Sequence, residues 1–306
     1  LKPMIAVLLC LLLTLPESSA RDLPESWPDW LKKEMQKEQK RLRDKPVEIG
    51  DGLFETRVPG KLQGKPEAFD GGWLISTDIG SDTVMECWLL TEKQDLAALA
   101  ARVANINIDN VADANGGETA RTIWLVEAGN VRNHPWLALE WLYNVGENEN
   151  KRVGLVKVRA AQVDSMSLAC SHNALGYQDT FARAFTTILG EASAAQDAMP
   201  AHYREIYRVS IGDQPVGYIR VSYATDEEGD TRNLVEETML MPVDASNLST
   251  SDAYATVWSR ADGSMINAYE SSAENGELTT QLQLAQTEDG DWWVSGTIQG
   301  KEIDSA

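Results

Sequence analysis

The sequence predicts an α+β protein, in which an N-terminal α+β sandwich-like domain precedes an antiparallel β-meander that forms an open curved sheet or a partial barrel. Three observations support this prediction. The N-terminal half carries apolar residues at helical spacing, with alternating segments between them. From residue 204 onward, apolar and polar residues alternate in evenly spaced segments separated by tight-turn dipeptides. The chain of 306 residues is long enough for two domains.

The first 20 residues have the pattern of a secretory signal peptide. One lysine precedes an apolar run at 4–15, and Ser18, Ser19 and Ala20 form a small-residue cleavage site. The apolar run is too short to span a bilayer. We expect cleavage after Ala20, removal of Cys10 with the signal, and no integral membrane segment in the mature chain. The protein is then periplasmic or extracellular.

Residues 21–45 predict an amphipathic helical arm. Trp27, Leu31 and Met35 recur every four residues among charged side chains, which gives the helix a narrow apolar stripe. We expect the arm to dock onto the next domain through this stripe.

Residues 46–190 predict one α+β domain. Segments 73–79 and 83–90 flank a short turn and predict a β-hairpin. Thr91 and Gln94 fit a capping box that starts a helix, and residues 112–120 predict a loop. Four strands and a final helix follow, at about 122–127, 138–143, 153–159, 165–171 and 179–189.

Residues 191–203 are small, polar and proline-containing and predict a linker. Residues 204–306 predict an antiparallel β domain, because tight-turn dipeptides at 262–263, 275–276 and 289–290 punctuate the alternating segments.

The charge of the chain excludes some partners. The formal net charge is −20, and from residue 201 onward 6 basic and 19 acidic residues give −13. Such a surface repels phosphate backbones and anionic lipids, so we do not expect nucleic-acid binding. An acidic solubilising surface explains the charge.

Cys87 and Cys170 are the two cysteines that remain after signal removal. In an oxidising compartment, a single pair in one domain predicts a disulfide. Catalysis is a competing hypothesis: Cys170 as nucleophile, His172 as base, and Asp179 or Asn173 as the group that orients the base.

A metal site is the other competing hypothesis for these cysteines. It would combine Cys87, Cys170, His172 and His134, but zinc favours ligands in short-range pairs, and only one such pair exists. We therefore expect no metal and no cofactor. His134 precedes Pro135 and is interpreted as a turn residue, with a lone functional histidine as the alternative.

Aromatic and acidic clusters give further candidates. Adjacent strand residues face opposite sides, so one of Trp292 and Trp293 must leave the core side, and the pair is a possible binding surface. Acidic residues at 226–230 favour a solvated turn over a calcium site, because the spacing of a calcium loop is absent. Tryptophans of the first domain predict a packed core or an aromatic ligand groove: Trp73, Trp88, Trp124, Trp136 and Trp141.

The stretch YRVSIGDQPVGY (207–218), with EETMLM and RADGSMINAYES downstream, resembles the β-rich region that precedes the catalytic domain in some bacterial secreted transglutaminase-like proteins. The resemblance implies an accessory domain without activity, because no cysteine follows Cys170 and no histidine follows His202. The order of elements in the first domain is similar in outline to PsbP and Mog1-like folds.

Together these observations predict a secreted or periplasmic, non-catalytic binding or accessory protein of the cell envelope, which binds a protein or an apolar ligand. An alternative hypothesis is that the chain is the N-terminal, non-catalytic portion of a longer transglutaminase-like cysteine hydrolase. Catalysis by Cys170 and His172 would instead require a reactive thiol in the native protein.

Overall fold

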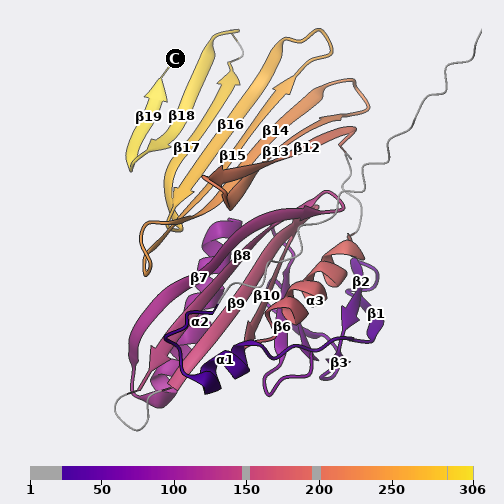
Figure 1. Ribbon diagram of the computed structural model, residues 1–306. Coiled ribbons are helices and arrows are strands. Elements are labelled where there is room, and N and C mark those ends of the chain that lie inside the picture. The colour runs from indigo at the N-terminus through magenta and orange to yellow at the C-terminus, as the bar shows by residue number, and fades with distance from the viewer. Residues whose placement is uncertain (1–22, 147–151, 195–200, 288, 306) are drawn as a thin grey trace, which may run out of the picture.

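The computed structural model describes residues 23–146, 152–194, 201–287 and 289–305 (Figure 1). The predicted signal peptide, Cys10 and residues 195–200 of the predicted linker lie outside these ranges. Across the described residues, three helices accompany antiparallel sheets, and no sheet closes on itself. The predicted α+β class is confirmed, and most of the structure is β-strand.

One eight-stranded antiparallel sheet organises the N-terminal half. Its strand order is β3-β5-β6-β10-β9-β8-β7, with β4 beside β5. The predicted hairpin is confirmed as β5 and β6, and the four predicted strands are β7 to β10. The bounds are β3 Lys61–Leu62, β4 Glu67–Phe69, β5 Gly72–Asp78, β6 Met85–Leu90, β7 Glu118–Val131, β8 His134–Val145, β9 Arg152–Val163 and β10 Met166–Asn173.

Both faces of this sheet are covered. Helix α2 (Leu96–Asn115) buries its apolar stripe on one face. Helix α3 (Gln178–Gly190) and a small sheet of β1 (Asp44–Ile49), β2 (Phe54–Pro59) and β11 (Ser193–Ala194) cover the other. Because β11 pairs with β2, the start of the predicted linker belongs to the N-terminal half.

Helix α2 runs further than the sequence predicts. The predicted loop at 112–120 was wrong over its first residues, since the helix continues to Asn115 and β7 begins at Glu118. The helix ends at Gly116, whose φ of +90° is the left-handed conformation that glycine adopts without a Cβ penalty.

The N-terminal arm docks as predicted but is only partly helical. Helix α1 spans Asp29–Met35, and its residues Leu31 and Met35 are buried. The ring of Trp27 lies 5.1 Å from that of Trp124. Beyond the end of α1, Glu38 caps another element: its carboxylate accepts hydrogen bonds from backbone N–H groups at the start of α3, 3.0 Å from Asp179 and 2.8 Å from Thr180.

The C-terminal half is one open meander of eight antiparallel strands in sequence order, with β12 and β19 at its edges (Figure 1). The predicted turns at 262–263, 275–276 and 289–290 connect its strands. The bounds are β12 Tyr203–Ile211, β13 Gln214–Thr225, β14 Thr231–Pro242, β15 Leu248–Ser259, β16 Met265–Glu274, β17 Glu277–Gln286, β18 Trp292–Ile298 and β19 Lys301–Ser305.

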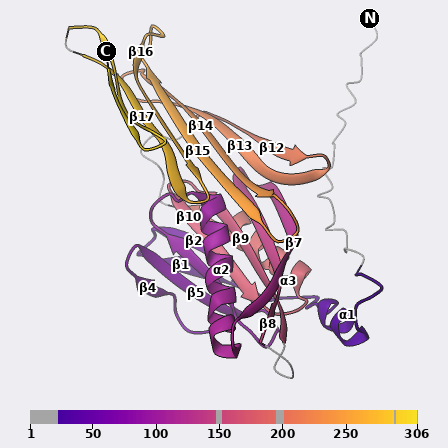
Figure 2. The ribbon, with the colours of Figure 1, turned by 90° about the vertical axis from the view of Figure 1, so that its left-hand side faces the viewer.

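The two halves share a hydrophobic core. Val216, Tyr218 and Leu240 from the meander are buried in the same cluster as the apolar stripe of α2. Figure 2 shows α2 standing against the first sheet, with the meander above it. One face of β13 to β15 is therefore occupied by the N-terminal half.

The N-terminus of α2 is capped across this junction. The two Asp252 carboxylate oxygens on β15 accept hydrogen bonds from the backbone N–H groups of Ala97 and Ala98, each 3.1 Å long, and Thr238 donates a third. The predicted capping box is wrong, because the hydroxyl of Thr91 bonds to the carbonyl of Gly71 instead. Burial raises the pKa of Asp252 against the opposing effect of these hydrogen bonds.

An ion cluster lies beside this cap, and its members Arg220 and Glu236 are buried. The carboxylate of Glu236 on β14 pairs with Arg220 on β13 and with Lys93, which precedes α2. The Lys93 ammonium also lies 3.9 Å from the ring centroid of Tyr254. Burial raises the pKa of Glu236, but the two cations outweigh this effect and hold the pKa below its usual value, so the carboxylate stays charged.

Substituting Asp252→Ala should lower the free energy of unfolding by about 1–3 kcal/mol, because it leaves buried N–H donors of α2 without an acceptor. Urea unfolding followed by circular dichroism measures the change. Asp213→Asn, at an exposed hairpin turn, is the matched control and should stay within about 0.5 kcal/mol of the parent protein. Equal stability of the two variants would contradict the cap.

Candidate functional site

One face of the meander is left uncovered, and we call it the open face. Residues directly opposite one another across antiparallel strands share a face. The register therefore defines three cross-strand rows, which begin at Tyr203, Glu205 and Tyr207 on β12. No side chain in these rows is buried, whereas residues on the other face of the same strands, such as Tyr218, are.

The middle of the open face is apolar. A sheet with one solvated face normally places polar residues there, so an apolar centre is informative. Val235 on β14 is 36% exposed, and its neighbours in the register are Val221 on β13 and Ala255 on β15. The valines and leucines of the three rows are Val221, Val235, Val257, Leu282, Leu284 and Val294.

The charges on the open face are predominantly negative. Glu205, Glu237 and Glu270 project from β12, β14 and β16, and in the three rows the single basic residue is Lys301 on the far edge strand. The open face therefore has carboxylates among its apolar residues, and no basic side chain of the same rows lies beside them.

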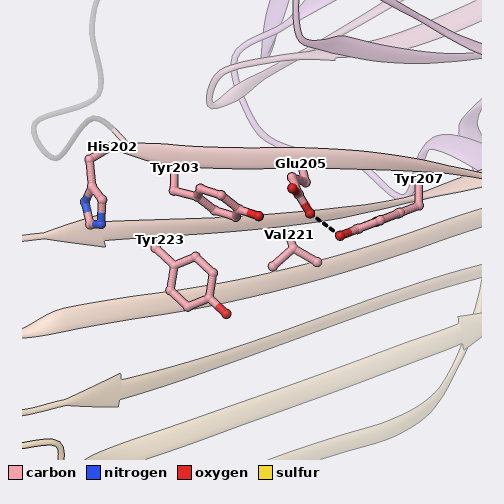
Figure 3. A pocket seen from close by; sticks show the side chains of 6 residues that line it. All are labelled: His202, Tyr203, Glu205, Tyr207, Val221 and Tyr223. Atoms are coloured by element: carbon pink, nitrogen blue, oxygen red, sulfur yellow. Dashed lines mark hydrogen bonds between the residues drawn. The ribbon is translucent and has the colours of Figure 1, made fainter.

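A hollow of about 460 Å³ lies at the β12 edge of the open face. It is lined by His202, Tyr203, Glu205, Tyr207, Val221 and Tyr223 (Figure 3). The rings of Tyr203 and Tyr223 pack with their centroids 5.5 Å apart. Figure 3 shows the hydroxyls of Tyr203 and Tyr207 directed toward the Glu205 carboxylate from either side.

Hydrogen bonding fixes the charge of Glu205. Its carboxylate accepts hydrogen bonds from the hydroxyls of Tyr203 and Tyr207, and these bonds lower its pKa. The same interaction raises the pKa of Tyr203 to about 12. At neutral pH the hollow therefore holds one carboxylate between neutral phenols.

This tyrosine hollow is missed by the sequence interpretation, although a signal for it exists. The stretch Tyr203-Arg204-Glu205-Ile206-Tyr207 has its aromatic and acidic residues at a period of two, which in a strand places all three on one face. Tyr223 joins them only through the β12–β13 register, which depends on the turn between these strands.

The structure places the predicted tryptophan pair at the far side of the meander. Trp292 and Trp293 begin β18 and point to opposite faces. Trp292 shares the open face with Val294, and Trp293, which is 39% exposed, lies on the other face. The pair is therefore not part of the tyrosine hollow, and its role as a binding surface stays a prediction.

The cysteine pair lies inside the first sheet. Cys87 and Cys170 are directly opposed in the β6–β10 ladder, and their Sγ atoms are 2.13 Å apart, which is disulfide distance. Both residues are fully buried in the core beneath α3. This geometry leaves neither sulfur available as a nucleophile.

His172 shares a face of β10 with Cys170 but bonds elsewhere. Its Nε2 lies 2.7 Å from the Oγ of Ser81, whose hydroxyl itself donates to the carbonyl of Thr83. One of the candidate orienting groups, Asn173, is engaged elsewhere, since it accepts a hydrogen bond from Tyr143. Burial, with the nearby Lys157, lowers the pKa of His172 to about 3, so the ring is neutral.

His134, the other histidine of the metal hypothesis, lies apart from Cys87, Cys170 and His172. His134 begins β8 directly after Arg132 and Asn133, both of which have positive φ. The turn consists of Arg132 and Asn133, so the interpretation of His134 itself as a turn residue is wrong by one position. Burial lowers its pKa as well.

The acidic turn between β13 and β14 brings carboxylates together. In the described part of the chain, Asp226, Glu228 and Asp230 are the group whose ligand atoms lie within 4.8 Å of one another. Asp226 Oδ1 accepts backbone hydrogen bonds of 3.0 and 2.9 Å from Glu228 and Asp230. Asp226 thereby closes the turn.

Comparisons with known proteins do not assign a family. No family model matches the chain, and no curated protein matches it. One solved structure, the crystal structure of the di-domain ARO/CYC StfQ from the steffimycin biosynthetic pathway, shares 9% identity over 71% of this chain and 85% of that chain. Its TM-score of 0.11 is too low to indicate a common fold. The likenesses to transglutaminase-like accessory regions and to PsbP and Mog1-like folds stay predictions.

Membrane insertion by a helix has no support in the described residues, where no helix has both the length and the apolarity that crossing requires.

The mature protein should contain no free thiol, native or denatured, until it is reduced. Replacing both Cys87 and Cys170 by alanine should lower the free energy of unfolding by about 3–5 kcal/mol, because the bond closes a long loop in the unfolded chain. Thiol titration and urea unfolding provide the two readouts. A thiol that reacts rapidly in the native, unreduced protein would refute the pairing.

Acid should destabilise the protein partly through His172. Its folded pKa lies below its unfolded value of about 6.5, so the unfolded state binds more protons and stability falls as pH falls below 6.5. Between pH 6.5 and 4.5 this contribution is about 2–3 kcal/mol, at about 1.36 kcal/mol per unit.

The His172→Gln variant isolates this contribution. Its loss of stability between pH 7 and 4.5, measured by urea unfolding, should be smaller than that of the parent protein by the same amount. His202→Gln, at an exposed position, is the control. Parallel pH profiles for the parent and His172→Gln would show that the histidine does not contribute.

Proposed function

We propose that this chain is a secreted or periplasmic, non-catalytic binding protein whose open face docks a protein partner with basic and apolar surface residues. The observation that carries the proposal is the open face itself, which combines an apolar centre with Glu205, Glu237 and Glu270 and has no buried side chain in its rows. Apolar residues at the centre of a patch with charges around them are typical of protein interfaces.

The chemistry of the partner follows from charge. The chain carries a net charge of −20, and 19 acidic residues against 6 basic ones lie beyond residue 200. A basic partner gains attraction and a faster encounter, whereas a second copy of this chain or an acidic protein is repelled. An apolar small ligand fits less well, because such ligands usually occupy enclosed cavities rather than a broad sheet face.

The location also rests on two observations. The pattern of residues 1–20 predicts export, and the buried cysteines at disulfide distance are typical of oxidising compartments.

Site-specific photo-crosslinking in the cells that produce the protein tests this function. A benzoylphenylalanine at Val235, at the centre of the open face, should capture one defined protein with a basic surface. The same group at Ile106, which is 51% exposed on α2, is the matched control and should not capture it. No adduct at Val235, the same adducts at both positions, or an adduct with the chain itself would contradict the proposal.

A further inference from the structure

We propose that the tyrosine hollow binds a side-chain cation, the guanidinium of arginine or the ammonium of lysine, presented by the protein partner. This inference rests on the proposed function, because it names the group that anchors the partner at the β12 edge of the open face. The hollow is defined by Tyr203, Glu205, Tyr207 and Tyr223, with Val221 below them and His202 at one end (Figure 3).

Three phenol rings supply surfaces that attract a cation. Tyr203 and Tyr207 stand two residues before and after Glu205 on β12, and Tyr223 lies directly opposite Tyr203 on β13. Tyr203 and Tyr207 are 42% and 52% exposed, so their ring faces remain accessible. A ring face attracts a cation within about 6 Å of its centroid, and the 5.5 Å separation of two of these rings keeps both within reach of one group.

The Glu205 carboxylate supplies the acceptor for the cation. An ionised carboxylate has about four acceptor sites, and the two tyrosine hydroxyls occupy two of them. The remaining sites accept N–H donors from a guanidinium or ammonium group, and the hydroxyls hold the carboxylate in place before the cation arrives. Because the hydrogen bonds lower the pKa of Glu205, the site remains anionic at neutral pH.

Other ligand classes fit this arrangement poorly. A phosphate or carboxylate ligand would meet the charge of Glu205, and the neighbouring basic residues Arg204 and Arg208 point to the opposite face of β12. An apolar group would contact the rings and Val221 but would leave the remaining acceptor sites of the Glu205 carboxylate unused. A cation with an aliphatic stem satisfies both the rings and the carboxylate.

A small probe tests the hollow without knowledge of the partner. The mature full-length protein, with 13C-labelled tyrosine rings, is titrated with Nα-acetyl-arginine N-methylamide and followed by NMR. Saturable shifts should occur at Tyr203, Tyr207 and Tyr223, while the buried Tyr218 stays unchanged. Nα-acetyl-norleucine N-methylamide, which has a stem without charge, should cause no saturable shift.

Substitutions separate the hollow from the general acidity of the surface. Glu205→Gln should weaken binding of the arginine probe by about 2- to 5-fold, as expected for a single exposed cation contact. Glu270→Gln removes one exposed carboxylate from the same face without a tyrosine neighbour in its row and should leave binding unchanged. Equal weakening by both substitutions, equal binding of norleucine, or absence of saturable shifts would overturn the inference.

The two experiments fail independently. Capture of a partner at Val235 without binding of the arginine probe keeps the docking face and removes the cation site. Binding of the probe without capture at Val235 keeps the cation site and removes the docking face.

Discussion

The structure depends on carboxylates that cap helices from a distance. The first N–H groups of a helix need acceptors, and neither α2 nor α3 finds one in a side chain of its own N-cap residue. Asp252 supplies the acceptor for α2 and Glu38 for α3, and in sequence these residues lie 155 and 141 positions from the backbone groups they bind. Each cap ties a helix end to a segment that is distant in the sequence.

The Asp252 cap fixes the position of the meander relative to α2, which apolar contact alone does not determine. The apolar stripe of α2 packs on the first sheet, and Val216, Tyr218 and Leu240 extend the same core into the meander. Hydrophobic contact is not directional. The Asp252 cap and the Lys93–Glu236–Arg220 cluster are directional, and burying their charges is costly unless the partners align. Together they fix the register between the two halves.

The sequence predicts local periodicity well and distant contacts poorly. Alternation at period two identified the meander and its Asp-Gly and Asn-Gly turns, because burial of one strand face imposes that period directly. The two helices were found from their apolar faces for the same reason. The local pattern predicts a cap of α2 from Thr91 and Gln94. It gives no information on Asp252, which lies on β15 and is distant in the sequence. Helix α1 is shorter than the predicted arm, and the contact of Glu38 with α3 is likewise absent from the local pattern.

The candidate site shows the same limit. Tyr203, Glu205 and Tyr207 lie on one strand at a period of two, so their shared face is readable from the sequence. The addition of Tyr223 requires the β12–β13 register, which passes through a bulge between Val209 and Ser210. A bulge shifts pairing by one residue, and in a strand such a shift moves every later side chain to the other face.

The two faces of the meander differ in what their side chains contact. On β13 to β15, the covered face carries Arg220, Glu236 and Asp252, each engaged with a partner in the junction. The open face of the same strands carries Val221 and Val235, for which the described chain supplies no cover. The covered face also buries Tyr218 and Leu240, so these strands carry apolar side chains on both faces, unlike a sheet with one solvated polar face. An apolar patch of this kind on an otherwise acidic sheet face is typical of surfaces that contact another molecule.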